Sequence, residues 1–237
     1  MRRYFPTLYR HVAARFAPDT TFGLHLTVGL ALLWLATWIF GEIASDVVAQ
    51  ARITIVDVQV SMWFHQHLSD GWTAFMLFIT NWNSPMGVLC MSVVFAGFLY
   101  GREARYWLAT LVLAISGGFL LNILLKYFYH RARPSFDHPL LTLSSYSFPS
   151  GHATGATLFY GMVAAYLVCV CRGWAARAAV AVVATLMVAL VALSRIYLGA
   201  HYLSDVLGAI AISCGWLAVC ITGISTLRRR RAARVTE

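Results

Sequence analysis

Long apolar runs with few charges recur along this chain, and they limit its fold more than any other feature. Several runs approach the roughly 20 residues that a helix needs to cross the hydrocarbon core of a bilayer. Hydrophobic residues make up 60% of the chain and charged residues only 11%, whereas a soluble domain carries about 25% charge. The sequence therefore predicts an integral membrane protein with an all-α fold.

Six membrane-spanning helices are predicted from these runs. They cover Phe22–Phe40, Pro85–Tyr100, Tyr106–Tyr127, His152–Cys171, Ala176–Tyr197 and Tyr202–Leu227. A further apolar stretch, Trp72–Trp82, leads into the second span. On this division, residues 22–227 form the membrane domain and residues 228–237 form a basic tail. Residues 1–21 are predicted to lie on the membrane surface, because apolar residues recur there at helical spacing among arginines.

The basic residues lie in short clusters between the spans, which is how membrane topology is encoded. With the N-terminus in the cytoplasm, most of the 18 lysine and arginine residues fall on the cytoplasmic side. The positive-inside rule therefore predicts six spans with both termini cytoplasmic. Because the clusters form no continuous basic stripe, no nucleic-acid partner is expected despite the net charge of +9.

Five cations lie on the predicted outer side, where the rule disfavours them. They are Arg52, Lys126, Arg131, Arg133 and Arg195. Four of the five lie in two places, near the end of the third span and near the end of the fifth. Cations that depart from the topological rule need another reason for their position, which directs attention to the residues around them.

The end of the fifth span carries one patch of reactive residues. His201 and Asp205 are four apart, so on a helix they would share one face. A carboxylate there can accept the Nδ1 proton of the imidazole and leave Nε2 as a nucleophile. Arg195 precedes His201 by six residues, which is a poor spacing for one helical face. Gly199 lies between them and predicts a break between the fifth and sixth spans.

A second patch, Pro149-Ser150-Gly151-His152, precedes the fourth span. Ser150 is a favourable N-cap, and the free N–H groups and the dipole of the following helix favour an anion there. Gly151 allows the backbone to approach a ligand closely. His152 would lie beside a bound phosphate, where an imidazole can transfer a proton.

The third patch lies at the end of the third span and supplies positive charge. Lys126 and Arg133 are seven apart, so they would converge if the helix persisted, although Pro134 disfavours helix at Arg133. A guanidinium suits two phosphate oxygens, whereas an ammonium acts as a point charge. Such cations complement the transition state of phosphoryl transfer. The sequence shows no carboxylate cluster for Mg²⁺ and no ATP-binding loop, so no metal or cofactor is expected.

Together the three patches resemble the complete signature of the type 2 phosphatidic acid phosphatase superfamily. That signature is K-x6-R-P, P-S-G-H and S-R-x5-H-x3-D, and this sequence matches every fixed position in order. The resemblance implies that the phosphate is bound by Lys126, Arg133, Ser150, Gly151 and Arg195. It also implies that His201 attacks phosphorus to form phosphohistidine, that His152 protonates the leaving oxygen and then activates water, and that Asp205 supports His201. Six spans favour the membrane lipid phosphatase branch over the soluble vanadium haloperoxidases.

The resemblance leads to a membrane phosphatase for a lipid phosphate or diphosphate as the leading hypothesis. The lipid and the bilayer are its predicted partners, and the sequence leaves the oligomeric state open. The site is expected at the periplasmic or extracellular face of the inner (plasma) membrane. Similarity to bacterial carrier-lipid phosphatases favours undecaprenyl diphosphate, with phosphatidylglycerophosphate, phosphatidic acid and lipid A phosphates as alternatives.

Two other classes of function are weighed against a phosphatase. A lipid phosphotransferase would pass the phosphate of the same phosphohistidine to another lipid. A transporter or a haem-binding membrane protein is the non-enzymatic alternative. Haem would need paired histidines deep within the spans, whereas His152 and His201 lie at span ends beside arginines.

Four further residues near the patches receive no catalytic role. His130 and Arg131 lie between Lys126 and Arg133, outside the fixed positions of that patch, and we interpret them as rim or headgroup contacts. His65 and His67 have a spacing that could hold a metal. We interpret the surrounding Trp63–His67 segment instead as amphipathic and interfacial.

Overall fold

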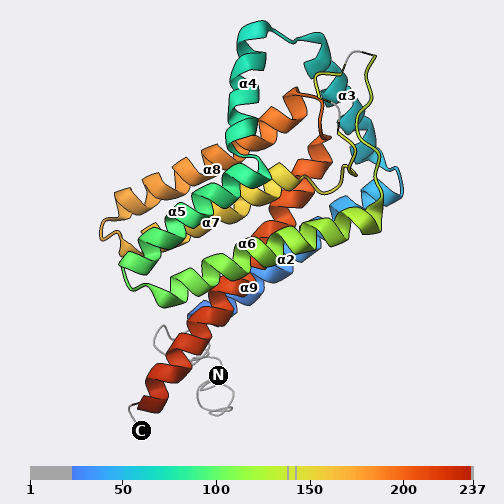
Figure 1. Cartoon of the computed structure of the whole chain (residues 1–237). Coiled ribbons are helices and arrows are strands. Elements are labelled where there is room, and N and C mark those ends of the chain that lie inside the picture. Colours follow the sequence, from blue (N-terminus) through green and yellow to red (C-terminus); the bar gives the residue numbers. More distant parts are fainter. Residues whose placement is uncertain (1–22, 138, 142, 236–237) are drawn as a thin grey trace.

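The computed structural model describes residues 23–137, 139–141 and 143–235, and this part of the chain contains helices but no strands. The predicted surface segment over residues 1–21 lies outside the described residues. The described helices are α2 (Leu24–Val48), α3 (Arg52–Gln66), α4 (Asp70–Trp82), α5 (Pro85–Gly101), α6 (Arg105–Tyr129), α7 (Gly151–Val170), α8 (Trp174–Tyr197) and α9 (Leu203–Val235) (Figure 1).

Five of these helices are long and apolar enough to cross a membrane: α2, α6, α7, α8 and α9. Helices α4 and α5 are bent by 53° relative to each other and are long and apolar enough only as a pair, which fits either one broken span or a re-entrant loop. The break lies where Ser84 caps α5 by accepting the N–H of Gly87 and Pro85 occupies the first turn. The prediction of an all-helical membrane protein is confirmed. The count of six spans and the cytoplasmic location of both termini stay predictions.

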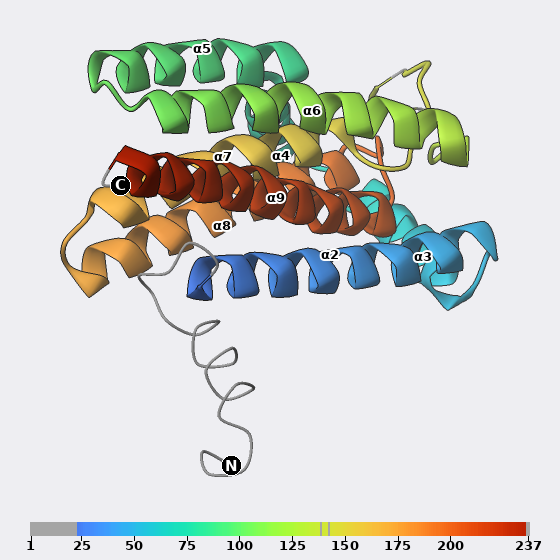
Figure 2. The same ribbon diagram turned by 90° about the horizontal axis from the view of Figure 1, so that it is seen from below.

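Helix α7 lies at the centre of the bundle and packs against α5, α6, α8 and α9 (Figure 2). Small residues such as Ala153 and Ala156 lie fully buried along it. At Gly118 of α6, a Cβ atom would come within 2.3 Å of the Leu158 side chain of α7, so a larger residue there would displace that buried leucine. Such contacts hold helices together in lipid, where apolar side chains gain little by leaving the surrounding tails.

Helices α2 and α9 form the other long pair of the bundle. The opposite face of α2 exposes large apolar side chains, including Trp34 and Trp38, as a lipid-facing surface does. Both helices extend beyond their predicted spans. Helix α2 continues to Val48, and α9 continues past Leu227 through the basic run at 228–231. The length of an apolar run in the sequence predicts the apolar part of a helix but not where its polar ends lie.

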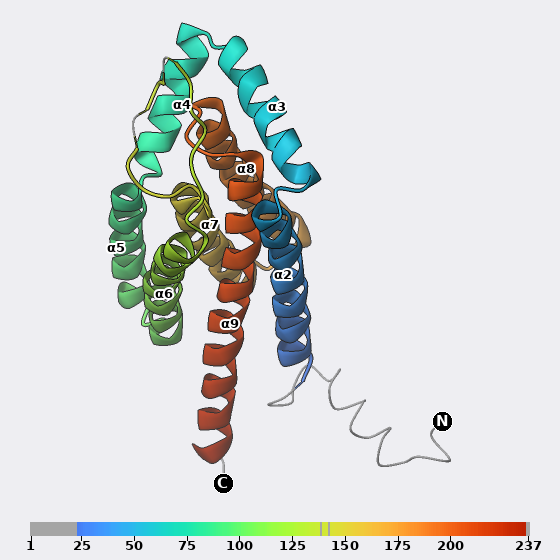
Figure 3. The same ribbon diagram turned by 90° about the vertical axis from the view of Figure 1, so that its right-hand side faces the viewer.

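Helices α3 and α4 lie at one end of the bundle, and the described non-helical residues of 130–137 and 143–150 lie at the same end (Figures 1 and 3). Helix α3 was not among the predicted spans, because residues such as Arg52, Asp57 and His65 interrupt its apolar pattern. It packs against α2, α8 and α9. This end, which we call the loop end, is where the three sequence patches meet.

Candidate active site

The three patches come from different helices and are joined at the loop end by one backbone hydrogen bond and by bonds from the side-chain amide of Asn122. The N–H of Ser150, which precedes α7, donates to the carbonyl of Asp205 in the first turn of α9 at 3.1 Å. The amide of Asn122 in α6 donates to the carbonyl of Pro149 at 3.1 Å and to the hydroxyl of Thr154 at 3.0 Å. These bonds bring the start of α7 against both neighbouring helices.

The turn between α8 and α9 carries the predicted nucleophile. Helix α8 ends at Tyr197, and Gly199 has a φ of +67°, so the chain breaks at the glycine that predicted the break. A Cβ atom at Gly199 would also lie 2.8 Å from Phe136. His201 lies two residues before α9 rather than on the helix, and the N–H of Tyr202 donates to Oδ2 of Asp205 at 2.9 Å. This bond closes the first turn of α9 in the manner of a capping box.

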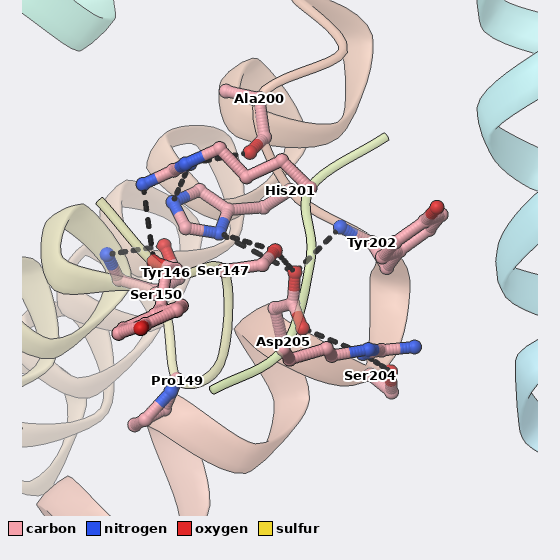
Figure 4. Close-up of polar contacts among 12 residues, drawn as sticks. Tyr146, Ser147, Pro149, Ser150, Ala200, His201, Tyr202, Ser204 and Asp205 are labelled. Carbon is pink, nitrogen blue, oxygen red and sulfur yellow. Dashed lines mark hydrogen bonds and ion pairs between the residues drawn. The ribbon is translucent and has the colours of Figure 1, made fainter. Parts of the chain in front are cut away.

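The two ring nitrogens of His201 face different partners. Nδ1 lies 3.4 Å from Oδ2 of Asp205 and 3.5 Å from the hydroxyl of Ser147, which itself donates to Asp205 (Figure 4). Nε2 lies 3.2 Å from a guanidinium nitrogen of Arg133. Because an arginine can only donate, Nε2 is the acceptor and the ring proton belongs on Nδ1, facing the carboxylate. This is the tautomer that leaves a lone pair on Nε2 for attack.

Burial sets the protonation state of this histidine. The ring is 2% exposed, and burial is the main cause that lowers the pKa of His201 to about 4. Asp205 opposes this effect, whereas the positive charges of Arg133 and Arg195 reinforce it. The imidazole of His201 is therefore neutral at neutral pH, with its Nε2 lone pair available.

Lys126 and Arg133 converge, though not along a continuous helix. Helix α6 ends at Tyr129, and His130 adopts a left-handed conformation with a φ of 48°. The segment that follows carries Arg133 back toward Lys126, and both side chains donate to the carbonyl of Tyr146, at 3.3 and 2.5 Å respectively. Arg133 also donates to the carbonyls of Ser145 and Ala200, each at 2.6 Å. Two cations and a cluster of carbonyl oxygens thus lie beside Nε2 of His201.

Arg195, in the last turn of α8, is a buried cation with few partners. It is 2% exposed, and one of its terminal nitrogens donates to the hydroxyl of Thr80 in α4 at 2.5 Å. Its Nε has no hydrogen-bond partner among the described residues. A buried guanidinium with an unused donor is unfavourable on its own, and an anionic ligand would satisfy it.

His152 is the second residue of α7 and follows the Ser150 cap, whose hydroxyl accepts the N–H of Ala153 at 3.5 Å. The cations that act on its ring are Arg195, Arg133 and Lys126, and the ring of His201 also lies close enough to act on it. The cations at the fixed motif positions and the two motif histidines therefore surround one space at the loop end.

One interpretation from the sequence is wrong. Arg131 is not a rim or headgroup contact, because its guanidinium lies 2.6 Å from Oδ1 of Asp205 and 2.7 Å from Oδ2 of Asp57. Its side chain is only 12% exposed. Burial alone would lower the pKa of Arg131, but the charges and hydrogen bonds of Asp205 and Asp57 outweigh it and raise the pKa. Spacing along a loop does not tell which way a side chain points.

Several residues outside the fixed positions of the motifs also take part in the site. Ser147, Asp57, Thr80, Asn122 and Ser204 contact patch residues or the backbone that carries them. Asp57 could have been selected from the sequence, because an acidic residue within an apolar segment is a functional candidate by default. The serines, Thr80 and Asn122 carried no such signal, since such residues are common in membrane helices.

Three other described histidines, His65, His67 and His130, do not contact His201 or Asp205. His65 of α3 stacks on Phe136 with ring centroids 4.2 Å apart, and Nδ1 of His67 lies 2.8 Å from the carbonyl of Trp63. His130 is exposed and contacts the ring of Tyr146 at 4.5 Å. Among the described residues, no group of three or more histidine, cysteine or acidic side chains has the arrangement of a metal site.

Comparison with known proteins agrees with the motif assignment. The family model of the PAP2 superfamily matches residues 105–229, which is more than half of the chain. Phosphatidylglycerophosphatase B from Bacillus subtilis (strain 168) is 37% identical over 122 residues, covering 51% of this chain and 59% of that protein. Decaprenylphosphoryl-5-phosphoribose phosphatase from Mycobacterium tuberculosis (strain ATCC 25618 / H37Rv) is 37% identical over 119 residues, covering 47% and 57% respectively. The chain thus matches less than two thirds of the length of each.

Solved structures extend the similarity over more of the fold. A transmembrane PAP2 type phosphatidylglycerolphosphate phosphatase from Bacillus subtilis superposes with a TM-score of 0.70 at 27% identity, covering 81% of this chain and 94% of that one. LpxE from Aquifex aeolicus gives a TM-score of 0.55 at 23% identity, covering 69% and 94%, and shows a likeness in fold. The matched family model, the order of the motifs and the shared architecture all lead to the same assignment: this chain belongs to the PAP2 superfamily.

Proposed function

We propose that this protein is a membrane phosphatase that hydrolyses a lipid phosphate through a phosphohistidine at His201. The observation that carries the proposal is the environment of the two nitrogens of that ring. Nδ1 faces the carboxylate of Asp205 at 3.4 Å, and Nε2 faces the guanidinium of Arg133 at 3.2 Å. The lone pair of a neutral imidazole is thus directed at the cations that would bind a phosphate.

The chemistry follows from these positions. Phosphate oxygens would take the place of the carbonyl oxygens that now accept from Lys126 and Arg133, and would satisfy the unused donor of Arg195. The negative charge of the bound phosphate would favour protonation of His152. Nε2 of His201 attacks phosphorus, the bond from phosphorus to the lipid oxygen breaks, and the protonated His152 donates its proton to that oxygen. His152 then takes a proton from water, whose oxygen attacks phosphorus and breaks the P–N bond. Inorganic phosphate and the dephosphorylated lipid are the products.

For the substrate, we propose a phospholipid phosphate of the phosphatidylglycerophosphate type. The support is the similarity, found both by sequence and by structure, to phosphatidylglycerophosphate phosphatase of Bacillus subtilis. The relatives described above are named for phosphatidylglycerophosphate and decaprenylphosphoryl-5-phosphoribose. Neither name specifies undecaprenyl diphosphate, so the lipid favoured by the sequence becomes one arm of the substrate test.

For the location, we propose that the site faces the periplasm or the extracellular side of the plasma membrane. The loop end carries the cations that depart from the positive-inside rule, whereas the arginine run 228–231 lies near the opposite end of α9 (Figure 1). That charge distribution would place the loop end outside. Sealed vesicles of right-side-out orientation should then release phosphate from added substrate without being opened.

Purified protein should release inorganic phosphate from a panel of lipid phosphates in the presence of a chelator. The panel contains phosphatidylglycerophosphate, phosphatidic acid, undecaprenyl phosphate, undecaprenyl diphosphate and a lipid A phosphate. We expect the highest kcat/KM with phosphatidylglycerophosphate and the same rates with and without EDTA, because the proposed mechanism uses side chains alone. Loss of activity on chelation would contradict the metal-free mechanism. Transfer of labelled phosphate to an added lipid, with little free phosphate, would make the protein a phosphotransferase.

The acidic limb of the pH profile of kcat/KM should lie near pH 4. The active form of His201 is the neutral ring, and its pKa is lowered to about 4, chiefly by burial. Activity should therefore persist as the pH falls through 6.5, the usual pKa of a histidine, and be lost only as the pH falls through about 4. Because kcat/KM reports the free enzyme, the pKa of the substrate phosphate is measured separately by ³¹P NMR and its contribution is removed. A limb near 6.5 after this correction would contradict a buried neutral nucleophile.

A further inference from the structure

Helix α3 reaches the site through one buried acidic residue. Asp57 lies outside the residues 105–229 that match the family model, yet it is 1% exposed. Its Oδ1 accepts the N–H of Ser204 at 2.8 Å, and its Oδ2 accepts the hydroxyl of Ser204 at 2.5 Å. Ser204 is the second residue of α9, where N–H groups have no partner within the helix. Asp57 therefore caps α9 from another helix, with its charge at the positive end of the helix dipole.

Arg131 joins this cap to the support of the nucleophile. One terminal nitrogen of its guanidinium donates to Oδ2 of Asp57 at 2.7 Å. The other donates to Oδ1 of Asp205 at 2.6 Å and to the hydroxyl of Ser204 at 2.7 Å. The ring of Tyr202 covers the guanidinium, with 4.6 Å between the ring centroid and the central carbon. The planar fork of an arginine suits this bridge between two carboxylates, which an ammonium could not hold in the same geometry.

The two oxygens of Asp205 are divided between two sets of partners. Oδ1 accepts from Arg131, whereas Oδ2 accepts from Tyr202 and Ser147 and faces Nδ1 of His201. Figure 4 shows His201, Tyr202 and Ser147 on the side of Asp205 that bears this second oxygen. Rotation of the carboxylate would exchange the oxygens and break both sets of contacts. The bond from Arg131 thus holds the carboxylate in the orientation that the imidazole uses.

We propose that Asp57 and Arg131 are positioning residues of the phosphatase site, an inference that rests on the proposed function. Arg131 orients the carboxylate of Asp205 toward His201, and Asp57 holds both Arg131 and the first turn of α9. Neither residue reaches the phosphate-binding cations through a hydrogen bond among the described residues. The catalytic unit would thus extend from the histidine through Asp205 and Arg131 to a carboxylate on α3.

The ion pairs of Arg131 with Asp57 and Asp205 also balance charge, which neutral side chains at these positions could not do. Asp57 and Asp205 are both buried, and Arg131 is the cation that lies between them. Without Arg131, two buried carboxylates would face each other without compensation, and one of them would tend to keep a proton. A protonated Asp205 would no longer accept fully from His201, so the histidine would lose its orienting partner.

Kinetics of Arg131→Gln and Asp57→Asn test the proposal with the preferred lipid phosphate of the panel. We expect kcat to fall roughly 10- to 100-fold, the size seen when residues that orient a functional group are replaced. KM should stay within about twofold, because neither side chain touches the phosphate. Asp57→Asn keeps an oxygen that can accept the N–H of Ser204, so it separates the ion pair from the cap. The double variant should be no slower than the slower single variant if both residues act through one contact.

Arg52→Gln is the matched control, since Arg52 is an exposed residue of α3, the helix that carries Asp57. It should keep the wild-type kcat and KM. If Arg131→Gln does not accumulate as folded protein, Arg131→Lys replaces it, and kcat should again fall while KM is kept.

The positioning role would be overturned if the folded Asp57 and Arg131 variants kept the wild-type kcat, or if their KM rose while kcat was unchanged. Either result would leave the proposed function intact. If the wild-type protein releases phosphate from no lipid of the panel, the proposed function itself fails and the positioning role with it.

Discussion

Replacing His201 with alanine is expected to lower kcat for phosphate release from a lipid phosphate by roughly 10⁴-fold or more. Without the nucleophile, the covalent intermediate cannot form. The ring is buried and held on both sides, by Asp205 and by Arg133. No other described imidazole lies in an equivalent position to replace it. Steady-state phosphate release measures the loss. Rapid quenching in alkali with ³²P-labelled lipid should trap labelled protein in the wild type and none in the variant.

His67→Ala is the matched control for this experiment. His67 ends α3 as an exposed residue, and its ring contacts the carbonyl of Trp63 rather than the cluster. This variant should keep wild-type turnover and wild-type labelling. Thermal unfolding of both variants separates a chemical defect from a folding defect. A His201→Ala protein that is folded and retains turnover would rule out the phosphohistidine mechanism.

Replacing His152 with glutamine is expected to lower kcat by about 10²- to 10⁴-fold, the usual contribution of a general acid or base. The effect should depend on the leaving group. A lipid alcohol is a poor leaving group and needs the proton from His152, whereas a diphosphate releases a phosphate ester that leaves more easily. Formation of the phosphoenzyme should therefore be slowed less with undecaprenyl diphosphate than with phosphatidylglycerophosphate. Its hydrolysis should be slowed with both, because His152 also activates the water.

Single-turnover measurements separate these two steps. With the diphosphate substrate, the His152→Gln protein should accumulate ³²P-labelled enzyme in alkali-quenched samples, at a level above that of the wild type. His130→Gln provides the control, because His130 is exposed and follows α6 at the rim of the site. Equal slowing of both substrates with no accumulation of labelled enzyme would contradict the acid–base role of His152.

Much of the site was predictable because its motifs are defined by local spacing. The break at Gly199, the cap at Ser150 and the pairing of His201 with Asp205 each depend on residues a few positions apart, and all three are found. The helical route that was considered for bringing Lys126 and Arg133 together is not found. The two converge through the turn at His130 and the segment after it, because the helix ends four residues before Arg133.

The errors concern residues whose partners are distant in the chain. Arg131 was interpreted as a rim residue and is buried between two carboxylates, one of them 74 residues away on α3. Helix α3 was not predicted as a span, because polar residues divide its apolar pattern, and only its last residues were interpreted, as an interfacial segment. Nothing in a single sequence states that Asp57 will meet Ser204 or that Thr80 will meet Arg195.

The sequence by itself determined that this protein is a helical membrane protein with the motifs of one superfamily. Those properties depend on run length, composition and short spacings, which act locally along the chain. Only the tertiary structure decided that α3 and α4 contribute to the site, that Arg131 faces inward, and that Asp205 divides its oxygens between the nucleophile and a buried ion pair. The physical reason is that the direction of a polar side chain at a helix end or in a loop depends on which partners the packed helices bring within hydrogen-bond distance.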